Sequence, residues 1–262
     1  MAKHLKNNIE LLWDLAKNDF KTKYAGSYLG MIWAFIQPII TILVYWLVFQ
    51  YGLRMGTPQD EQPYALWFIT GIVPWFFFAD ALNNGANCLK EYDYLVKKVI
   101  FPIKLLPLIK LLSALFVHLV FVVFLAIIYA VYGRFLLIHP IRLLYYGLCL
   151  TLLSLGLMYI SSSIIVFFKD LGQIINVILQ VGMWATPILW NYKDVVPDSL
   201  LWIFKLNPMF YIVEGYRNSM LEDVNLLSHW VQMLYNWALI GILLYFGTKL
   251  FNKLEAHFAD VL

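Results

Sequence analysis

The sequence predicts an all-α integral membrane protein with six transmembrane helices. Of the 262 residues, 62% are hydrophobic and 13% are charged, whereas soluble domains have roughly 45–50% apolar and about 25% charged residues. Six stretches without Asp, Glu, Lys or Arg have lengths near the ~20 residues that a helix needs to cross the hydrocarbon core. These stretches are continuously apolar and lack the alternation of barrel strands. We expect residues 1–262 to form one transmembrane domain.

Each expected span is assigned as a helix because a lone strand would leave backbone groups unpaired in lipid. The segments on the side of both termini hold thirteen Lys and Arg residues, and the opposite segments hold six. This bias places both termini in the cytoplasm of a bacterial cell. In chain order, the charge-free stretches are residues 24–53, 62–79, 111–133, 143–168, 171–192 and 224–248.

Residues 3–21 precede the first span and have the periodicity of an amphipathic helix. Their apolar residues recur at steps of three and four, which places them on one helical face. Such a helix lies in the membrane surface, the interpretation we favour, or packs on a soluble partner. The residues of this face are Leu5, Ile9, Leu12, Ala16 and Phe20.

The segment between the second and third spans, residues 90–104, is short and charged. A helix here would project from the cytoplasmic side and could contact a soluble partner. An ordinary connecting loop fits the sequence equally well.

Residues 194–223 are apolar but are interrupted by Pro197 and by Asn207-Pro208. The pieces 199–206 and 209–213 are each too short to span the membrane. We therefore expect a re-entrant helix pair, with a helix lying flat on the outer surface as the alternative. Within this segment Glu214 and Arg217 are three residues apart and could pair on one helical face.

No motif of the sequence indicates chemistry within the chain. The dipeptide Gly-Lys of a phosphate-binding loop is absent, as are HExxH and GxSxG. The five histidines are scattered, and His118 is expected to make a packing hydrogen bond inside the third span. We expect no catalytic residue, metal or cofactor, and the modest charge of +3 argues against a nucleic-acid partner. Because the spans are almost free of acidic residues, an ion gradient is a poor energy source.

Several short motifs resemble the type-2 ABC exporter permeases of polysaccharides. Residues 23–33, which contain Tyr24, Ser27, Leu29-Gly30 and Trp33, resemble that family's entry to the first span. Lys169 stands where the family usually has arginine. Further motifs follow in the family's order at 37–38, 71–76, 168–170, 186–188, 207–208 and 214–217.

This resemblance implies a complex rather than a lone chain. Two copies would form a channel above two copies of a separate ATP-binding subunit, which would bind ATP and Mg. The substrate would be a polymer on a polyprenyl diphosphate lipid. Residues 44–54 and 257–262 are most similar to wall teichoic acid exporters. O-antigen or capsular polysaccharide is the alternative; a drug exporter, a membrane-embedded lipid-phosphate enzyme and a passive channel are less favoured.

The resemblance also implies roles for individual residues. A coupling segment would contact the ATPase, and an extracellular gate would lie in the broken segment. Aromatic residues would line the substrate channel, although aromatic belts at the membrane interfaces explain many of them. Lys21 and Lys23 would attract the diphosphate, or would only determine topology. The coupling residues are Glu91, Tyr92, Asp93, Tyr94, Lys97 and Lys98; the gate residues are Asn207, Pro208, Glu214 and Arg217; the channel residues are Tyr45, Trp46, Phe49, Trp75, Phe76 and Trp184.

Overall fold

The computed structural model describes residues 2–54, 63–97, 101–221 and 226–262, and these residues form helices and connecting turns without a strand. The expected all-α fold class is confirmed. The α-helices are α1 (Ala2–Lys23), α2 (Trp33–Leu47), α3 (Tyr64–Glu91), α4 (Asp93–Val96), α5 (Leu105–Val131), α6 (Pro140–Ile165), α7 (Leu171–Ala185), α8 (Tyr192–Val195), α9 (Leu201–Lys205), α10 (Pro208–Met220) and α11 (Trp230–Val261).

Five helical stretches of the described chain are long and apolar enough to cross a membrane. The helix at the fifth predicted span is shorter: α7 has 15 residues and the chain leaves the helix at Thr186. At ~1.5 Å per residue it extends about 22 Å, less than a ~30 Å hydrocarbon core. A count of six full spans therefore stays a prediction. The five stretches are Gly30–Gly52, Tyr64–Glu91, Leu105–Val131, Pro140–Ile165 and Trp230–Val261.

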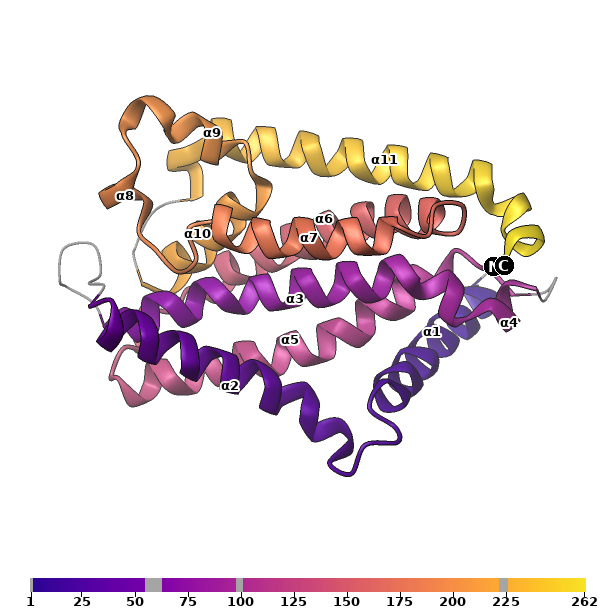
Figure 1. The fold of residues 1–262 in the computed structure, drawn as a ribbon, viewed down its shortest axis with the longest axis horizontal. Helices are drawn as coiled ribbons and strands as arrows, with labels where there is room; N and C mark the ends of the chain where they lie inside the picture. Colours follow the sequence, from indigo (N-terminus) through magenta and orange to yellow (C-terminus); the bar gives the residue numbers. More distant parts are fainter. Residues whose placement is uncertain (1, 55–62, 98–100, 222–225) are drawn as a thin grey trace.

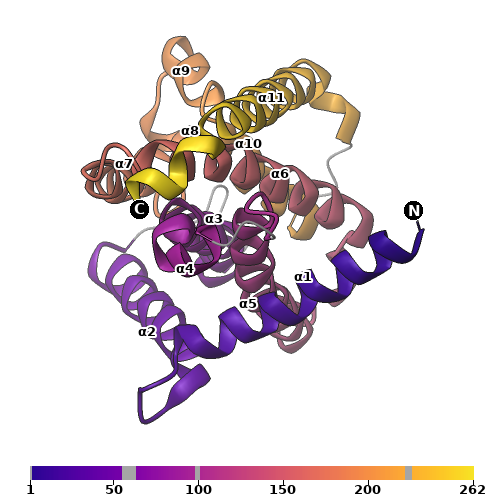
Figure 2. The ribbon, with the colours of Figure 1, turned by 90° about the vertical axis from the view of Figure 1, so that its right-hand side faces the viewer.

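Helix α3 forms the centre of the bundle. It packs against α2, α5, α6, α7 and α10, and most of its side chains are buried. Figures 1 and 2 show these helices grouped around it, with α11 lying outside α6. The middle of the single chain is thus filled by a helix.

The two ends of the bundle carry different elements. Helices α1 and α4 lie at the end where α11 terminates, which we call the α1 end, and α8, α9 and α10 lie at the other, the α9 end (Figure 1). The N- and C-terminal helices therefore reach the same end, as the predicted topology requires.

Helices α6 and α11 approach closely at two glycines. A Cβ added at Gly247 would lie 2.7 Å from the carbonyl oxygen of Gly156. Such a distance is closer than atoms tolerate, so only glycine allows these backbones to meet. Small residues serve the same purpose at helix contacts in membranes generally.

Several helices extend beyond the charge-free stretches that predicted them, among them α3, α5 and α11. The second span was expected to end at residue 79, but α3 continues past Asp80 to Glu91. The third was expected to begin at 111, but α5 begins at Leu105 and contains Lys110. Paired charges are tolerated inside such helices, and both Asp80 and Lys110 form ion pairs.

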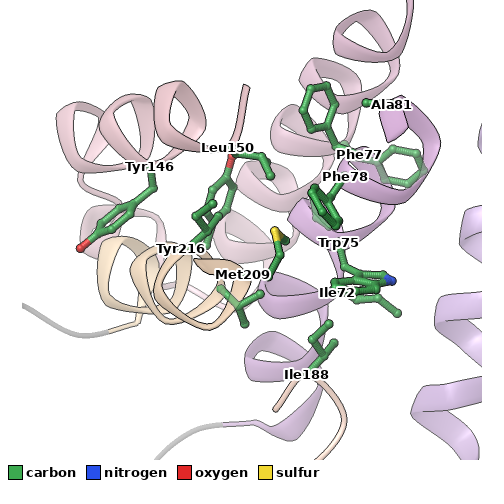
Figure 3. Close-up of a cluster of buried hydrophobic side chains, with 14 of the residues drawn as sticks. Ile72, Trp75, Phe77, Phe78, Ala81, Tyr146, Leu150, Ile188, Met209 and Tyr216 are labelled. Atoms are coloured by element: carbon green, nitrogen blue, oxygen red, sulfur yellow. The ribbon is translucent and has the colours of Figure 1, made fainter. Parts of the chain in front are cut away.

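The segment after α7 folds into short helices followed by α10. Asn207 caps α10 through its side chain, and Pro208 occupies the first turn, where a missing N–H costs nothing. Helix α10 is largely buried and packs against α3 and α6. In Figure 3, Met209 and Tyr216 of α10 lie between Trp75 of α3 and Tyr146 of α6. A re-entrant path through a membrane stays a prediction.

Candidate functional site

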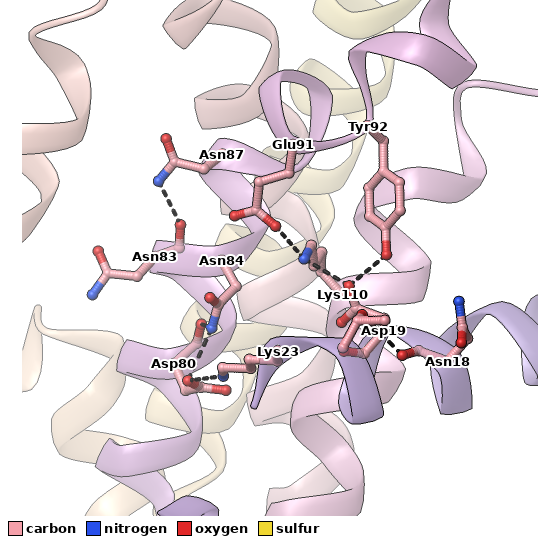
Figure 4. A network of polar contacts seen from close by, with 11 residues as sticks. Asn18, Asp19, Lys23, Asp80, Asn83, Asn84, Asn87, Glu91, Tyr92 and Lys110 are labelled. Carbon is pink, nitrogen blue, oxygen red and sulfur yellow. Dashed lines mark hydrogen bonds and ion pairs between the residues drawn. The ribbon is translucent and has the colours of Figure 1, made fainter. Parts of the chain in front are cut away.

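Lys110 is buried at the α1 end, where it joins three segments of the chain. Its Nζ lies 2.7 Å from Oδ1 of Asp19 on α1 and also pairs with Glu91 at the end of α3. The hydroxyl of Tyr92 donates a 2.6 Å hydrogen bond to the same Asp19 oxygen. Figure 4 shows these four side chains converging. We call Asp19, Glu91, Tyr92 and Lys110 the Lys110 cluster.

The Lys110 cluster is protected from solvent on its α1 side. The side chains of Lys110 and Asp19 are 6% and 3% exposed, while that of Glu91 is 47% exposed. Burial, followed by the hydrogen bond to Asp19, raises the pKa of Tyr92 above its ordinary value. Tyr92 therefore remains a hydrogen-bond donor at physiological pH.

A second ion pair lies near the Lys110 cluster and involves a predicted headgroup residue. Lys23 Nζ is 2.6 Å from Oδ1 of Asp80, which also accepts a 2.9 Å hydrogen bond from Asn84. Lys21 is exposed. The charge of Lys23 is thus partly neutralised within the chain, and attraction of a diphosphate by these lysines stays a prediction.

The predicted coupling segment contains one helical turn, α4, rather than a longer helix. Asp93 and Lys97 form an exposed ion pair of 3.6 Å across it. The ring of Tyr94 is exposed and lies 6.1 Å from that of Tyr92. Lys98 lies outside the described residues. The structure therefore brings Glu91 into contact with Lys110 of α5 and Tyr92 into contact with Asp19 of α1, and it leaves Asp93, Tyr94 and Lys97 at the surface.

Helix α1 attaches to α5 through apolar as well as ionic contacts. The ring of Trp13 meets Phe116 edge-on at 5.0 Å, and Phe20 lies 6.3 Å from the same ring. Ala16 and Asp19 are buried on this side. The amphipathic helix predicted for residues 3–21 is present, and its described buried side covers α5.

Arg217 of α10 is the corresponding buried cation at the α9 end. Its guanidinium is 2.6 Å from Glu214 and donates hydrogen bonds to the carbonyls of Pro187 and Ile188 at 2.8 and 3.1 Å. It also lies 3.5 Å from the ring centroid of Trp67. A planar guanidinium suits several fixed acceptors together with an aromatic face. We call Trp67, Pro187, Ile188, Glu214 and Arg217 the Arg217 cluster.

The chain after α7 is also hydrogen-bonded to the starts of α10 and α3. Asn207 Nδ2 donates a 2.9 Å hydrogen bond to Thr186 Oγ1, and its Oδ1 caps the backbone N–H of Met209 at 3.0 Å. Tyr64 at the start of α3 donates a 2.9 Å hydrogen bond to the carbonyl of Leu189. The predicted pairing of Glu214 with Arg217 is confirmed, and motifs far apart in sequence meet here.

The predicted channel residues occupy different environments. Phe49 and Trp75 are buried within the chain, Tyr45, Trp46 and Phe76 are half-buried, and Trp184 is 52% exposed. The Phe49 and Trp184 rings lie 6.4 Å apart and connect the first span to α7. Phe76 borders a cavity of about 270 Å³ between α2, α3 and α5. Lining of a channel by these residues stays a prediction.

The end of the first span departs from the expected regular helix. Residues Val48–Gly52 form a π-helical turn, in which the N–H of Leu53 bonds to the carbonyl of Val48 at 2.9 Å. With regular α-helical steps of four and three, Tyr45, Phe49 and Gly52 would share one face. A wider turn rotates Gly52 away from that spacing.

Sequence reasoning missed Asp19, Asp80 and Lys110 as site residues. The sequence held one signal for Asp19, which is its position directly before Phe20 of the predicted apolar face. The predicted hydrogen bond of His118 is present, with Nε2 2.9 Å from Tyr216 OH. Within the described chain, no group of three His, Cys, Asp or Glu side chains could hold a metal ion.

Comparison with known proteins gives consistent matches along most of the chain. The family model described as ABC-2 type transporter matches residues 10–221. The chain is 28% identical to the O-antigen export system permease protein RfbA of Klebsiella pneumoniae, with 100% of each chain covered. It is 26% identical to RfbA of Myxococcus xanthus, covering 95% of this chain and 94% of that one. It is 20% identical to the polysialic acid transport protein KpsM of Escherichia coli over 90% of each chain.

Proposed function

This chain belongs to the ABC-2 type transporter family and is the membrane subunit of a polysaccharide exporter, and on that premise we propose that its substrate is a lipid-linked O-antigen or capsular polysaccharide. The observation that carries the proposal is the end-to-end alignment with an O-antigen export permease. The relatives are an O-antigen export permease and a polysialic acid transport protein, which supports this substrate class better than wall teichoic acid, the narrower expectation from the motifs.

The proposed channel lies between two copies of the chain. A hydrated sugar polymer cannot cross hydrocarbon, since its polar groups would lose their hydrogen bonds to water. A single chain offers no such route along its axis, because α3 fills the centre. Helices α2 and α7 present exposed apolar side chains such as Val44, Leu47 and Val181, which suit lipid or a second copy. Tyr45, Trp46 and Trp184 would lie near that boundary.

A separate ATP-binding subunit, two copies per complex, would dock at the α1 end and bind ATP and Mg. Members of this family work with such a partner. Asp93, Tyr94 and Lys97 are the described coupling residues at the surface there. Movement of α4 would pass through Glu91 and Tyr92 into Lys110 and Asp19, so that α1 and α5 move with it. The α1 end would face the cytoplasm.

The Arg217 cluster would hold the outer end closed between transport events. It ties α10 to α3 and to the segment after α7 through polar contacts. Such contacts have one favoured geometry, so a shift of α7 would break several together. A closed seal matters because an open wet channel would leak ions.

Depletion of the chain in its native cells tests the proposed substrate. Mass spectrometry of extracted polyprenyl-linked glycans should show the accumulation of a repeating glycan whose backbone lacks glycerol phosphate and ribitol phosphate, and re-expression of the wild-type chain should clear it. Accumulation of a glycerol- or ribitol-phosphate polymer would instead support teichoic acid export. If no lipid-linked polymer accumulates, polysaccharide export by this chain is contradicted. A matched strain that carries Lys97→Gln tests the coupling to the ATP-binding subunit. In this strain we expect the lipid-linked glycan to accumulate partially.

A further inference from the structure

A second cavity lies at the α9 end, away from the Lys110 cluster. Its walls come from α6, α8, α9, α10 and α11, so five helices of one chain contribute, and its volume is about 190 Å³. That volume is the space of about six waters at ~30 Å³ each. It is larger than a phosphate needs and smaller than the ~300 Å³ lower limit of drug-sized ligand sites. One sugar ring with a charged substituent fits this range.

The charge around this cavity is positive. Lys193 of α8 and Lys205 of α9 line it, and neither forms an ion pair within the described residues. Glu214 is the acidic residue in the described lining, and its carboxylate lies 2.6 Å from the Arg217 guanidinium. The lysines are therefore not neutralised, and a cavity with an excess of one sign of charge concentrates ions of the opposite sign.

The remaining lining suits a hydroxylated ring rather than a bare anion. Tyr146, Tyr192 and Tyr211 contribute aromatic side chains from three helices. Gln232 Nε2 is buried and has no hydrogen-bond partner among the described residues. A buried donor without a partner costs about 1–3 kcal/mol, which an oxygen of a ligand would offset. Aromatic area with a few convergent polar groups is the usual composition of a small-ligand site.

We propose that this cavity, between Lys193, Lys205, Gln232 and Tyr192, binds a sugar unit that carries a carboxylate or a phosphate. The unit would belong to the exported glycan as it emerges at the α9 end, so this assignment rests on the proposed function. The lysines would neutralise the acidic group, and Gln232 would donate to a ring or hydroxyl oxygen. Binding of one unit after another would bias the chain outward.

Binding to the purified full-length chain in nanodiscs of neutral phosphatidylcholine tests the site. The probes are glucuronate and glucose 6-phosphate, with glucose and inorganic phosphate as comparators, measured by saturation-transfer difference NMR. Both acidic sugars should bind more tightly than glucose and than phosphate alone. The double variant Lys193→Gln/Lys205→Gln should weaken their binding at least about tenfold, because hydrogen bonds to charged groups contribute about 1.5–3 kcal/mol.

The matched control is Lys169→Gln/Lys253→Gln, which removes two exposed lysines away from this cavity. It should bind the acidic sugars as the wild type does. The thermal midpoint of both variants should stay at the wild-type value, because exposed lysines carry little stability.

Three outcomes would overturn the assignment. Inorganic phosphate that binds as tightly as glucose 6-phosphate would mean that the site takes a free anion or a lipid headgroup. Equal binding of glucose and glucuronate would remove the role of charge. Undiminished binding in the lysine variant would place the site elsewhere. None of these three outcomes contradicts glycan export. If depletion of the chain causes no lipid-linked polymer to accumulate while the purified chain still binds acidic sugars, only the proposed function is overturned.

Discussion

Lys110 and Asp19 are 91 positions apart in the sequence, and their Nζ and Oδ1 atoms are 2.7 Å apart in the structure. Both side chains are almost fully buried. Helix α1 is thus bound to α5 by an ion pair as well as by the ring contacts of Trp13 and Phe20 with Phe116. Separation of α1 from the bundle would leave Asp19 without a charged partner, whereas Lys110 would keep its ion pair with Glu91.

Substitution Lys110→Met should destabilise the chain by about 3–5 kcal/mol, because it strands a buried carboxylate. Asp19→Asn should cost less, since Lys110 keeps Glu91 and the amide oxygen still accepts from Tyr92. The double variant Lys110→Met/Asp19→Leu should be more stable than Lys110→Met alone, because replacement of a whole buried pair is often neutral. Chemical unfolding in detergent measures all three.

Lys97→Met is the matched control for this cycle. It breaks the Lys97–Asp93 pair, whose side chains are 48% and 49% exposed. Exposed pairs contribute at most about 1 kcal/mol. If Lys97→Met destabilises the chain as much as Lys110→Met, burial is not the source of the effect.

Tyr92 should make the stability of the chain fall steeply at alkaline pH. Burial and the hydrogen bond to Asp19 raise its pKa, whereas an unfolded tyrosine ionises near pH 10. Above about pH 10 the folded state therefore holds a proton that the unfolded state has lost. The stabilisation is present below that pH and is lost as pH rises. Tyr92→Phe should have a shallower fall in thermal midpoint from about pH 9 to about pH 11.

Tyr28→Phe is the control, because the ring of Tyr28 is fully exposed. It should keep the wild-type pH dependence. A Tyr92→Phe profile that coincides with that of the wild type would contradict the buried donor.

Gly71 contacts Arg217 so closely that alanine should not fit. An added Cβ would lie 2.6 Å from Nη2 of Arg217, and the guanidinium is held by Pro187, Ile188 and Glu214. Gly71→Ala should destabilise the chain by about 1–3 kcal/mol, as overpacking does, although alanine favours helix by ~1 kcal/mol. Unfolding in detergent measures this effect.

Gly241→Ala is the matched substitution, because nothing lies within 4 Å of a Cβ added there in α11. It should be neutral or stabilising by up to about 1 kcal/mol. Equal stability of the two variants would show that Arg217 moves freely.

Much of the fold follows from local sequence patterns. Long apolar stretches specify membrane helices whatever their neighbours are, and the 3–4 periodicity of residues 3–21 specifies α1. For α3 and α5, the charge-free stretches are too short because the charge that bounds each stretch has a distant partner. The charge-free stretches are bounded by Lys110 and Asp80. Lys110 is neutralised by Asp19, 91 positions away, and Asp80 by Lys23, so neither charge ends its helix.

The candidate sites were predictable only in part for the same reason. Glu214 and Arg217 are three residues apart on one helix, so local spacing was enough to predict their contact. Asp19, Glu91 and Lys110 come from three helices, and no local pattern relates them. The π-helical turn at Val48–Gly52 interrupts the regular helical spacing of Tyr45 and Phe49, and that spacing does not predict the turn.

Asn207 should stabilise α10 through two separable hydrogen bonds. Its Oδ1 caps Met209 N–H, and its Nδ2 donates to Thr186 Oγ1. Thr186→Val removes only the second bond and should cost about 1 kcal/mol. Asn207→Ala removes both and should cost about 2 kcal/mol, since loss of a cap costs about 1 kcal/mol as well.

The double variant Thr186→Val/Asn207→Ala should be no less stable than Asn207→Ala, because its second change removes a bond already lost. Thr248→Val removes a hydroxyl whose bonds, among the described residues, lie within its own helix. It should combine additively with Asn207→Ala in the same unfolding measurement. Additivity for Thr186→Val as well would contradict the hydrogen bond between α10 and the segment after α7.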